Sequence, residues 1–166
     1  MLSKVEKNHT TGLSVDIYSS DNVYPLLPLL SEEFPEWTID KIKNYVKLVV
    51  SKEDTIAGLL VVKNESLYNV GLLVYTFQSV STNYLYANNK KKFSKGLVVE
   101  NIVASSPILK QQIFLLIVDH AIGIAKKNNC GFIELPKFSE TFKLIEKKYN
   151  KQIIKINSYR TAIDIS

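Results

Sequence analysis

Glu100 is the one charged residue in the apolar run from Leu97 to Ala104. A run of this length, rich in β-branched residues, predicts a buried β-strand. Because a charged group among apolar side chains is a candidate functional residue, Glu100 is our candidate general base. Strand alternation would place Glu100 on one face with Ile102 and Ala104, and Asn101 on the other face. The alternative is that Glu100 pairs with a lysine on the face of the sheet.

Hydroxyl and cationic side chains follow this strand, at the point where a helix is expected to begin. Ser106 and Pro107 are typical of a helix N-cap and first helical position, so we predict a helix from Pro107 to Asn128. The hydroxyls of Ser105 and Ser106 would then cap this helix. The alternative is that they contact a phosphate, with the charge of Lys110 beside them.

The cysteine and the histidines show no pattern of a metal or disulfide site. The sequence holds one cysteine, Cys130, which excludes an internal disulfide, and its apolar context predicts a buried thiol. Cys130, His9 and His120 lack the spacing of a metal-binding motif. His120 follows Asp119 in the predicted helix, where a structural role is the simpler interpretation.

The composition is that of a globular domain. The chain has 166 residues, of which 46% are hydrophobic and 22% charged. Its 21 Lys and Arg residues against 16 Asp and Glu residues give a net charge of +5, but Arg160 is the only arginine. Nucleic-acid-binding surfaces usually cluster both basic residue types, so we expect no nucleic-acid partner. The longest apolar run is far shorter than the ~20 residues that span a membrane, and we expect neither a signal peptide nor a membrane span.

Hydrophobic periodicity predicts the elements that must position these residues. They are a strand at 13–18, a short helix or irregular turn at 24–30, a helix at 39–49 after Thr38, strands at 55–62 and 67–80, a polar loop at 81–95, a strand at 97–104, a helix at 107–128, a strand at 131–135, a helix at 139–148, and strands at 152–156 and 159–165. This order predicts a single α/β domain over residues 1–166, with 1–11 flexible. Its mixed sheet would have an antiparallel N-terminal half and one parallel crossover through the central helix.

The junction from Ala104 to Phe114 is the place where we expect a ligand. In α/β folds, ligands bind where a strand ends and its crossover helix begins.

The order of elements resembles that of the GNAT N-acetyltransferase superfamily, over nearly the whole chain. In sequence the resemblance is strongest at DHAIGIAKKNNCGFIEL, residues 119–135, which looks like the family's acetyl-CoA-binding helix and the strand after it. A second stretch, FKLIEKKYNKQI at residues 142–153, looks like the family's late helix. The resemblance implies a single-domain GNAT-like fold and an enzyme that transfers an acetyl group from acetyl-CoA to an amine.

The family's signature, Q/R-x-x-G-x-G/A, lies at the start of the central helix. Its glycines let backbone N–H groups approach the CoA pyrophosphate. In this chain the signature falls on residues 109–114, and strand amides near Ile102 to Ala104 would orient the pantetheine. The cofactor-binding residues that the resemblance implies are Ile102, Ala104, Ser105, Ser106, Lys110, Gln111 and Gln112.

The resemblance also implies catalytic residues. The family often has a glutamate on the central strand, which matches Glu100 as the base. The family's general-acid tyrosine falls at Ile145, one turn before Tyr149. Tyr149 is therefore our candidate acid, with Tyr159 as another. For both tyrosines the alternative is packing.

The signature residues themselves favour a second hypothesis. Leu109 stands where the family has Gln or Arg, and Gln112 and Phe114 stand where it has small residues. A similar loss is found in acetyltransferase-like domains among the virion components of some bacteriophages. The alternative function is therefore a non-catalytic assembly or interaction protein that no longer binds CoA. It would contact protein partners through the 81–95 loop and the 24–37 segment, in a virion and not in the cytoplasm expected of the enzyme.

Overall fold

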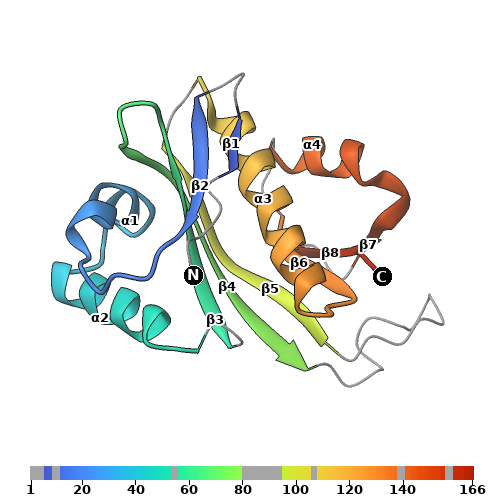
Figure 1. The fold of residues 1–166 in the computed structure, drawn as a ribbon, viewed down its shortest axis with the longest axis horizontal. Helices are drawn as coiled ribbons and strands as arrows, with labels where there is room; N and C mark the ends of the chain where they lie inside the picture. The colour runs from blue at the N-terminus through green and yellow to red at the C-terminus, as the bar shows by residue number, and fades with distance from the viewer. Residues whose placement is uncertain are drawn as a thin grey trace.

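Helices cover both faces of a central sheet in the computed structural model, which describes residues 6–8, 12–53, 56–79, 95–105, 108–137, 141–155 and 159–166 (Figure 1). The sheet has eight strands in the order β1-β2-β3-β4-β5-β6-β8-β7. Their bounds are β1 Glu6–Asn8, β2 Leu13–Ile17, β3 Ala57–Lys63, β4 Asn69–Ser79, β5 Lys95–Ala104, β6 Phe132–Pro136, β7 Ile153–Lys155 and β8 Arg160–Asp164. All neighbouring strands are antiparallel except β5 and β6, which are parallel.

The helices form one layer on each side of the sheet. The 3-10 helix η1 (Tyr24–Leu26), α1 (Leu27–Glu33) and α2 (Ile39–Val50) lie on one side, and α3 (Lys110–Lys127) and α4 (Thr141–Lys148) lie on the other (Figure 1). A further 3-10 turn, η2, spans Asn150–Gln152. Since α3 follows β5 and precedes β6, it is the crossover that parallel pairing requires.

Helix α2 illustrates how local sequence fixes these layers. The Thr38 side chain accepts a hydrogen bond from the Lys41 amide at 3.2 Å, which caps the first turn. Ile42, Val46 and Val49 recur at helical spacing and are buried, while Lys41 and Lys47 are exposed.

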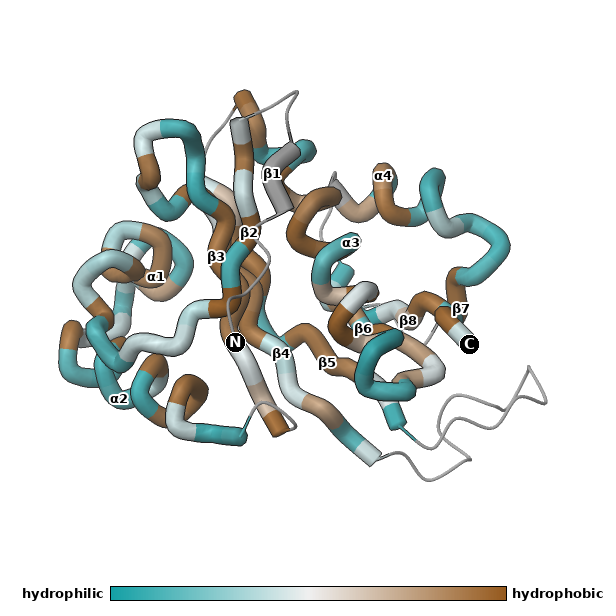
Figure 2. Tube along the Cα trace, viewed as in Figure 1, coloured by the Kyte–Doolittle hydropathy of each residue, from teal (hydrophilic) through white to brown (hydrophobic). Residues whose placement is uncertain are grey.

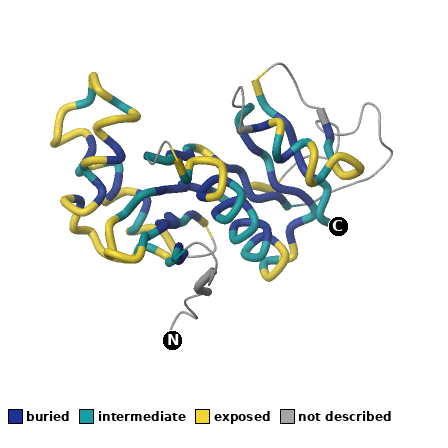
Figure 3. Tube along the Cα trace, turned by 90° about the horizontal axis from the view of Figure 1, so that it is seen from above, coloured by how far each residue is buried: buried dark blue, intermediate teal, exposed yellow. Residues whose placement is uncertain are grey.

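Two hydrophobic cores lie on the two faces of the sheet. Strands β3, β4 and β5 are buried on both faces, so their successive residues enter alternate cores. The core under α3 and α4 includes Leu60, Val62, Leu73, Leu97, Val99, Ile113, Ile117 and Ile133. The core under α1 and α2 includes Leu26, Leu30, Ile42, Val46, Leu59, Val61, Leu72 and Val74. Figure 2 shows the hydrophobic residues gathered on the central strands and on α3, and Figure 3 shows burial at the middle of the molecule with exposure at its periphery.

The predicted fold class and element order are confirmed, with two differences in the described residues. Residues 6–8, expected in a flexible segment, pair with β2 as strand β1. The central helix was predicted to begin at Pro107, but α3 begins at Lys110 after a turn at Ile108 and Leu109. The start is late because the Ser105 amide bonds to the Val70 carbonyl of β4 at 3.0 Å and continues the strand pairing. Ser106 and Pro107 themselves, and the predicted loop except Lys95, lie outside the described residues.

No helix in the described parts of the chain combines the length and the apolar character needed to cross a membrane.

Candidate functional site

Strands β5 and β6 pair over only three residues before they part. The parallel register joins Gly96, Leu97 and Val98 to residues 132–134 of β6. Beyond Val98, β5 continues to Ala104 with β4 as its only described strand partner. We call this unpaired side of β5, residues 99–104 facing β6, the β5–β6 fork.

Backbone polar groups of β5 face into the fork. The Ser105 amide donates to β4, and because the peptide is planar and trans, the Ala104 carbonyl points the opposite way, toward the fork. Ile102 lies two residues earlier in the strand, so its backbone groups share that direction. The strand backbone predicted to orient a pantetheine at Ile102 and Ala104 therefore faces the fork. The Val99 carbonyl also faces this side, where it accepts a hydrogen bond from the Arg160 guanidinium at 2.8 Å.

A β-bulge at Glu100 sets the side chains of the site. Val99 is the partner of Tyr75 on β4 and Asn101 is the partner of Val74, so Glu100 is the extra residue in β5. The bulge turns two consecutive side chains, Glu100 and Asn101, toward the α1/α2 face.

Hydrogen bonds fix both of these side chains. Glu100 Oε1 accepts a hydrogen bond of 3.0 Å from Thr76 Oγ1, and Asn101 Nδ2 donates one of 2.7 Å to Tyr45 Oη on α2. Ile102 packs in the opposite core, under α3 and α4. The predictions that Glu100 shares a face with Ile102 and that Asn101 lies on the other face are therefore wrong, because the bulge breaks the strand alternation that both assumed.

An aromatic cluster borders these polar groups. Phe34 and Trp37 stack with ring centroids 4.1 Å apart, and Tyr45 meets both rings edge-on. Burial raises the pKa of Tyr45 and the charge of Glu100 raises it further, while the hydrogen bond from Asn101 opposes the shift. Tyr45 therefore presents a protonated hydroxyl near the Glu100 carboxylate.

The N-terminal turn of α3 presents three of the predicted cofactor-binding residues to solvent. Lys110, Gln111 and Gln112 are exposed, whereas Ile113 and Phe114 are buried in the core beneath α3. The Phe114 ring, at a position where the family signature has a small residue, thus packs inward, away from the surface where an anion would approach. The amides of a helix N-terminus favour such an anion.

Lys110 and Ser105 have neighbours that compete with a phosphate. Burial raises the pKa of Glu33 at the end of α1, and the nearby charge of Lys110 opposes this shift. The Ser105 hydroxyl lies 3.4 Å from the Val70 carbonyl, to which it can donate. Ser106, the other predicted hydroxyl, lies outside the described residues.

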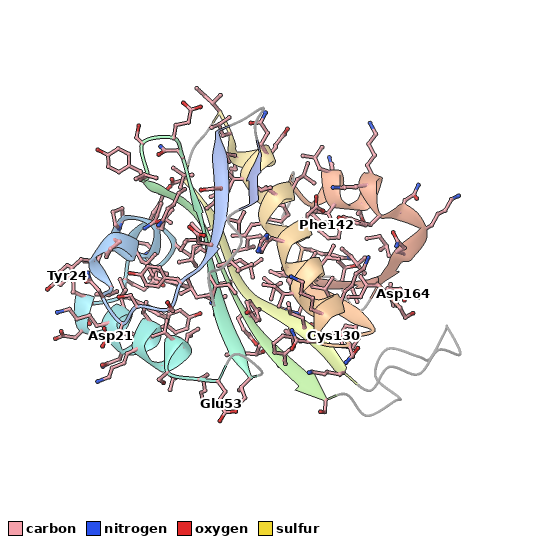
Figure 4. The ribbon with its side chains drawn as sticks, in the orientation of Figure 1. Asp21, Tyr24, Glu53, Cys130, Phe142 and Asp164 are labelled. Carbon is pink, nitrogen blue, oxygen red and sulfur yellow. The ribbon has the colours of Figure 1, made fainter. Side chains whose placement is uncertain are left out.

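Tyr149 lies on the opposite side of the sheet from Glu100. Its hydroxyl donates to Asp119 of α3, which also forms an ion pair with Lys148. Tyr149 packs against the core that contains Phe142, a residue of α4 on the side toward α3 (Figure 4). Burial, the hydrogen bond and the charge of Asp119 all raise the pKa of Tyr149. The structure therefore does not bring the two predicted catalytic side chains together; Tyr159 is exposed.

The cysteine is buried, as predicted, and burial raises the pKa of its thiol. Within the described ranges no three His, Cys, Asp or Glu side chains form a group that could hold a metal ion.

Three side chains near the site were not predicted from the sequence. Tyr45 and Thr76 hold the bulge residues, and nothing in the sequence pairs them with Asn101 and Glu100. Arg160 could have been chosen as a candidate site residue from the sequence, because it is the only arginine of the chain.

Solved structures of acetyltransferases share the fold of this chain. A GNAT family acetyltransferase from Staphylococcus aureus is 14% identical, over 78% of this chain and 90% of its own, with a TM-score of 0.59. The aminoglycoside 6'-N-acetyltransferase AAC(6')-Ih from Acinetobacter baumannii is 12% identical, over 84% of this chain and 88% of its own, with a TM-score of 0.61. The chain has the GNAT fold.

A third structure with the GNAT fold was solved with a ligand. AAC(6')-Iy, in complex with the bisubstrate analogue CoA-S-monomethyl-acetylneamine, is 8% identical over 84% of this chain and 88% of its own, with a TM-score of 0.61. No family model matches this chain, and no curated protein sequence matches it either. At these identities the GNAT fold is what the comparisons establish.

Proposed function

We propose that the protein is an acyl-CoA-dependent N-acetyltransferase whose acceptor is an amine. The observation that carries this proposal is the carboxylate of Glu100 at a bulge beside a strand fork. A fork of this kind offers an extended ligand a strand edge with backbone donors and acceptors. The structural match that was solved with a CoA-containing bisubstrate analogue supports the same assignment.

The residues around the fork fit a CoA thioester. An extended pantetheine arm would pair with the backbone of Ile102 and Ala104, whose polar groups face away from β4. The diphosphate would lie at the exposed first turn of α3, near Lys110, Gln111 and Gln112. The thioester supplies an activated acetyl group for transfer to nitrogen.

Glu100 would act on the acceptor. An amine is mostly protonated at neutral pH, and its nitrogen can attack only after it loses a proton. The Glu100 carboxylate is exposed and oriented by Thr76, so it can accept this proton directly or through one water. Tyr149 would reach the reaction only if its hydrogen bond to Asp119 broke. We therefore assign Glu100 as the general base and assign the general-acid role to a group other than Tyr149.

Binding of acetyl-CoA is the decisive test of this function. A ligand present at ~100 times its dissociation constant stabilises the folded state by about 2.7 kcal/mol. We therefore expect millimolar acetyl-CoA to raise the melting temperature by several degrees, with desulfo-CoA and ATP as controls for the thiol and the nucleotide. No shift with acetyl-CoA would contradict the proposal.

The N-terminal part of α3 favours a second candidate, a non-catalytic protein that uses the GNAT fold for assembly. Gln112 occupies a position where the family signature has a small residue. Ile108, Leu67 and Tyr68 are large apolar side chains with high exposure, as expected of a surface that binds another protein. Such a protein could act in a virion, whereas the enzyme is expected in a cytoplasm. Tight binding of acetyl-CoA would exclude this candidate.

A further inference from the structure

Arg160 joins three strands at the closed end of the β5–β6 fork. From β8 its side chain passes over β6, where its Nε atom pairs with Glu134 Oε1. Its Nη2 atom then donates a hydrogen bond of 2.8 Å to the Val99 carbonyl on β5. The side chains of Arg160 and Glu134 are 26% and 13% exposed, so the pair is largely shielded from water.

Pro136 explains why this carbonyl is open to a side chain. In a parallel ladder, bonds recur every second residue along each strand. The register pairs Val98 with Glu134, so the next donor to reach the Val99 carbonyl would be the amide of residue 136. Proline has no amide hydrogen, and the parallel ladder therefore ends there. Arg160, the partner of Pro136 on β8, provides the missing donor.

The direction of the proposed ligand brings its acyl end to this point. The first turn of α3 follows the C-terminal end of β5, so a diphosphate bound there lies at the open end of the fork. A linear thioester held by its diphosphate and by the backbone of Ile102 and Ala104 points its acyl group toward Val99. The guanidinium of Arg160 lies at that end.

We propose that Arg160 forms the floor of the acyl site and restricts the acyl group on CoA to about the length of acetyl. This specificity role rests on the proposed function. Arg160 is held by a charged pair and a backbone hydrogen bond, so it does not move aside without leaving the Val99 carbonyl and Glu134 unpaired. A longer alkyl chain would have to displace it or bury methylene groups against a guanidinium, which is unfavourable.

Binding of CoA thioesters of increasing chain length tests this role. The probes are acetyl-, butanoyl- and hexanoyl-CoA, and the readout is the dissociation constant by calorimetry. The variant is E134Q/R160A, which removes the guanidinium of Arg160 and leaves no unpaired carboxylate at position 134. The control is D16N/K63A, which removes another ion pair of the sheet, the pair between Asp16 and Lys63. If E134Q/R160A does not fold, E134Q/R160Q replaces it, because the shorter amide side chain can still donate to a carbonyl.

We expect the wild type and the control to bind hexanoyl-CoA at least about tenfold more weakly than acetyl-CoA, since each methylene that a pocket rejects costs about that factor. In E134Q/R160A this preference should shrink about tenfold or reverse. A purely structural role would change affinity for all three thioesters equally, and an unchanged ratio would overturn the specificity role while leaving the proposed function intact. If neither the wild type nor the control binds any of the three thioesters, the specificity role and the proposed function are both wrong.

Discussion

Asn101 Nδ2 lies 2.7 Å from the hydroxyl oxygen of Tyr45, and this hydrogen bond ties the bulge of β5 to helix α2. The bond is possible because Glu100 is the extra residue of the bulge, so Glu100 and Asn101 both point to the α1/α2 face of the sheet. Tyr45 in turn contacts Phe34 and Trp37, so the bulge, the helix and the aromatic cluster form one connected unit.

The hydrogen bond between Asn101 and Tyr45 should contribute measurably to stability. A part-buried hydrogen bond of this kind contributes about 1 kcal/mol. We expect Y45F and N101A each to lower the free energy of unfolding by about that amount or more, and the double variant to cost less than the sum of the two. Urea denaturation of the four proteins gives the coupling energy, and a value near zero would show that the bond does not hold the bulge.

Replacement of the candidate base should separate binding from transfer. E100Q keeps the shape of the side chain and removes the charge that accepts a proton. We expect the acetyl-transfer rate to an amine, followed by release of the CoA thiol, to fall about 10²- to 10⁴-fold with little change in acetyl-CoA affinity. The control is E53Q, because Glu53 is an exposed carboxylate in the segment after α2, outside the site (Figure 4). Equal rates for E100Q and E53Q would remove Glu100 from the mechanism.

The sequence predicts the order and type of most elements because their apolar residues follow a helical or strand period. Leu59 to Val62 and Leu72 to Val74 are continuous apolar runs, as expected of strands covered on both faces. The same continuity hides the bulge. In a run of Val, Glu, Asn and Ile, no residue type marks Glu100 as the unpaired one, since register depends on contacts with β4.

The start of α3 and the role of Arg160 depend on contacts that are distant in sequence. Ser106 and Pro107 form a strong local start signal, yet the bond from Ser105 to Val70 extends the strand pairing and delays the helix to Lys110. The bond from Arg160 to Val99 spans 61 residues. Local propensity describes neither contact, so the fold was more predictable than the site.

Two glycines test how tightly α3 packs on the sheet. A Cβ at Gly71 would lie 2.5 Å from Ile113 Cγ2 and 3.2 Å from the Val62 side chain, so G71A overpacks the core and should destabilise by about 1–3 kcal/mol. A Cβ at Gly123, inside α3, would have nothing within 4 Å, so G123A should stabilise by about 0.5–1 kcal/mol through helix propensity. Thermal denaturation of both variants measures the difference. A neutral G71A would mean that α3 shifts easily on β4.

The bond between Tyr149 and Asp119 predicts how stability depends on alkaline pH. Burial raises the pKa of Tyr149 above its ordinary value of 10.0, so the folded state retains the hydroxyl proton where the unfolded chain loses it. The contribution is complete below pH 10 and is lost as the pH rises further, because ionisation then favours the unfolded chain. We expect the free energy of unfolding to fall more steeply between about pH 10 and pH 12 in the wild type than in Y149F. Parallel curves would contradict the shift.

The pairing of Pro136 with Arg160 predicts that a backbone amide can replace the arginine. With Glu134 changed to glutamine throughout, R160A should lower the free energy of unfolding by about 1–3 kcal/mol, because the Val99 carbonyl loses its donor. P136A restores an amide hydrogen at the next position of the parallel ladder, so it should recover part of this loss in the R160A background. In the presence of Arg160, P136A should instead cost up to about 1 kcal/mol, since the unfolded chain gains freedom. Because the two substitutions act on one carbonyl, denaturation of all four combinations should give a favourable coupling energy, and simple additivity would mean that Pro136 is not the reason that Arg160 reaches β5.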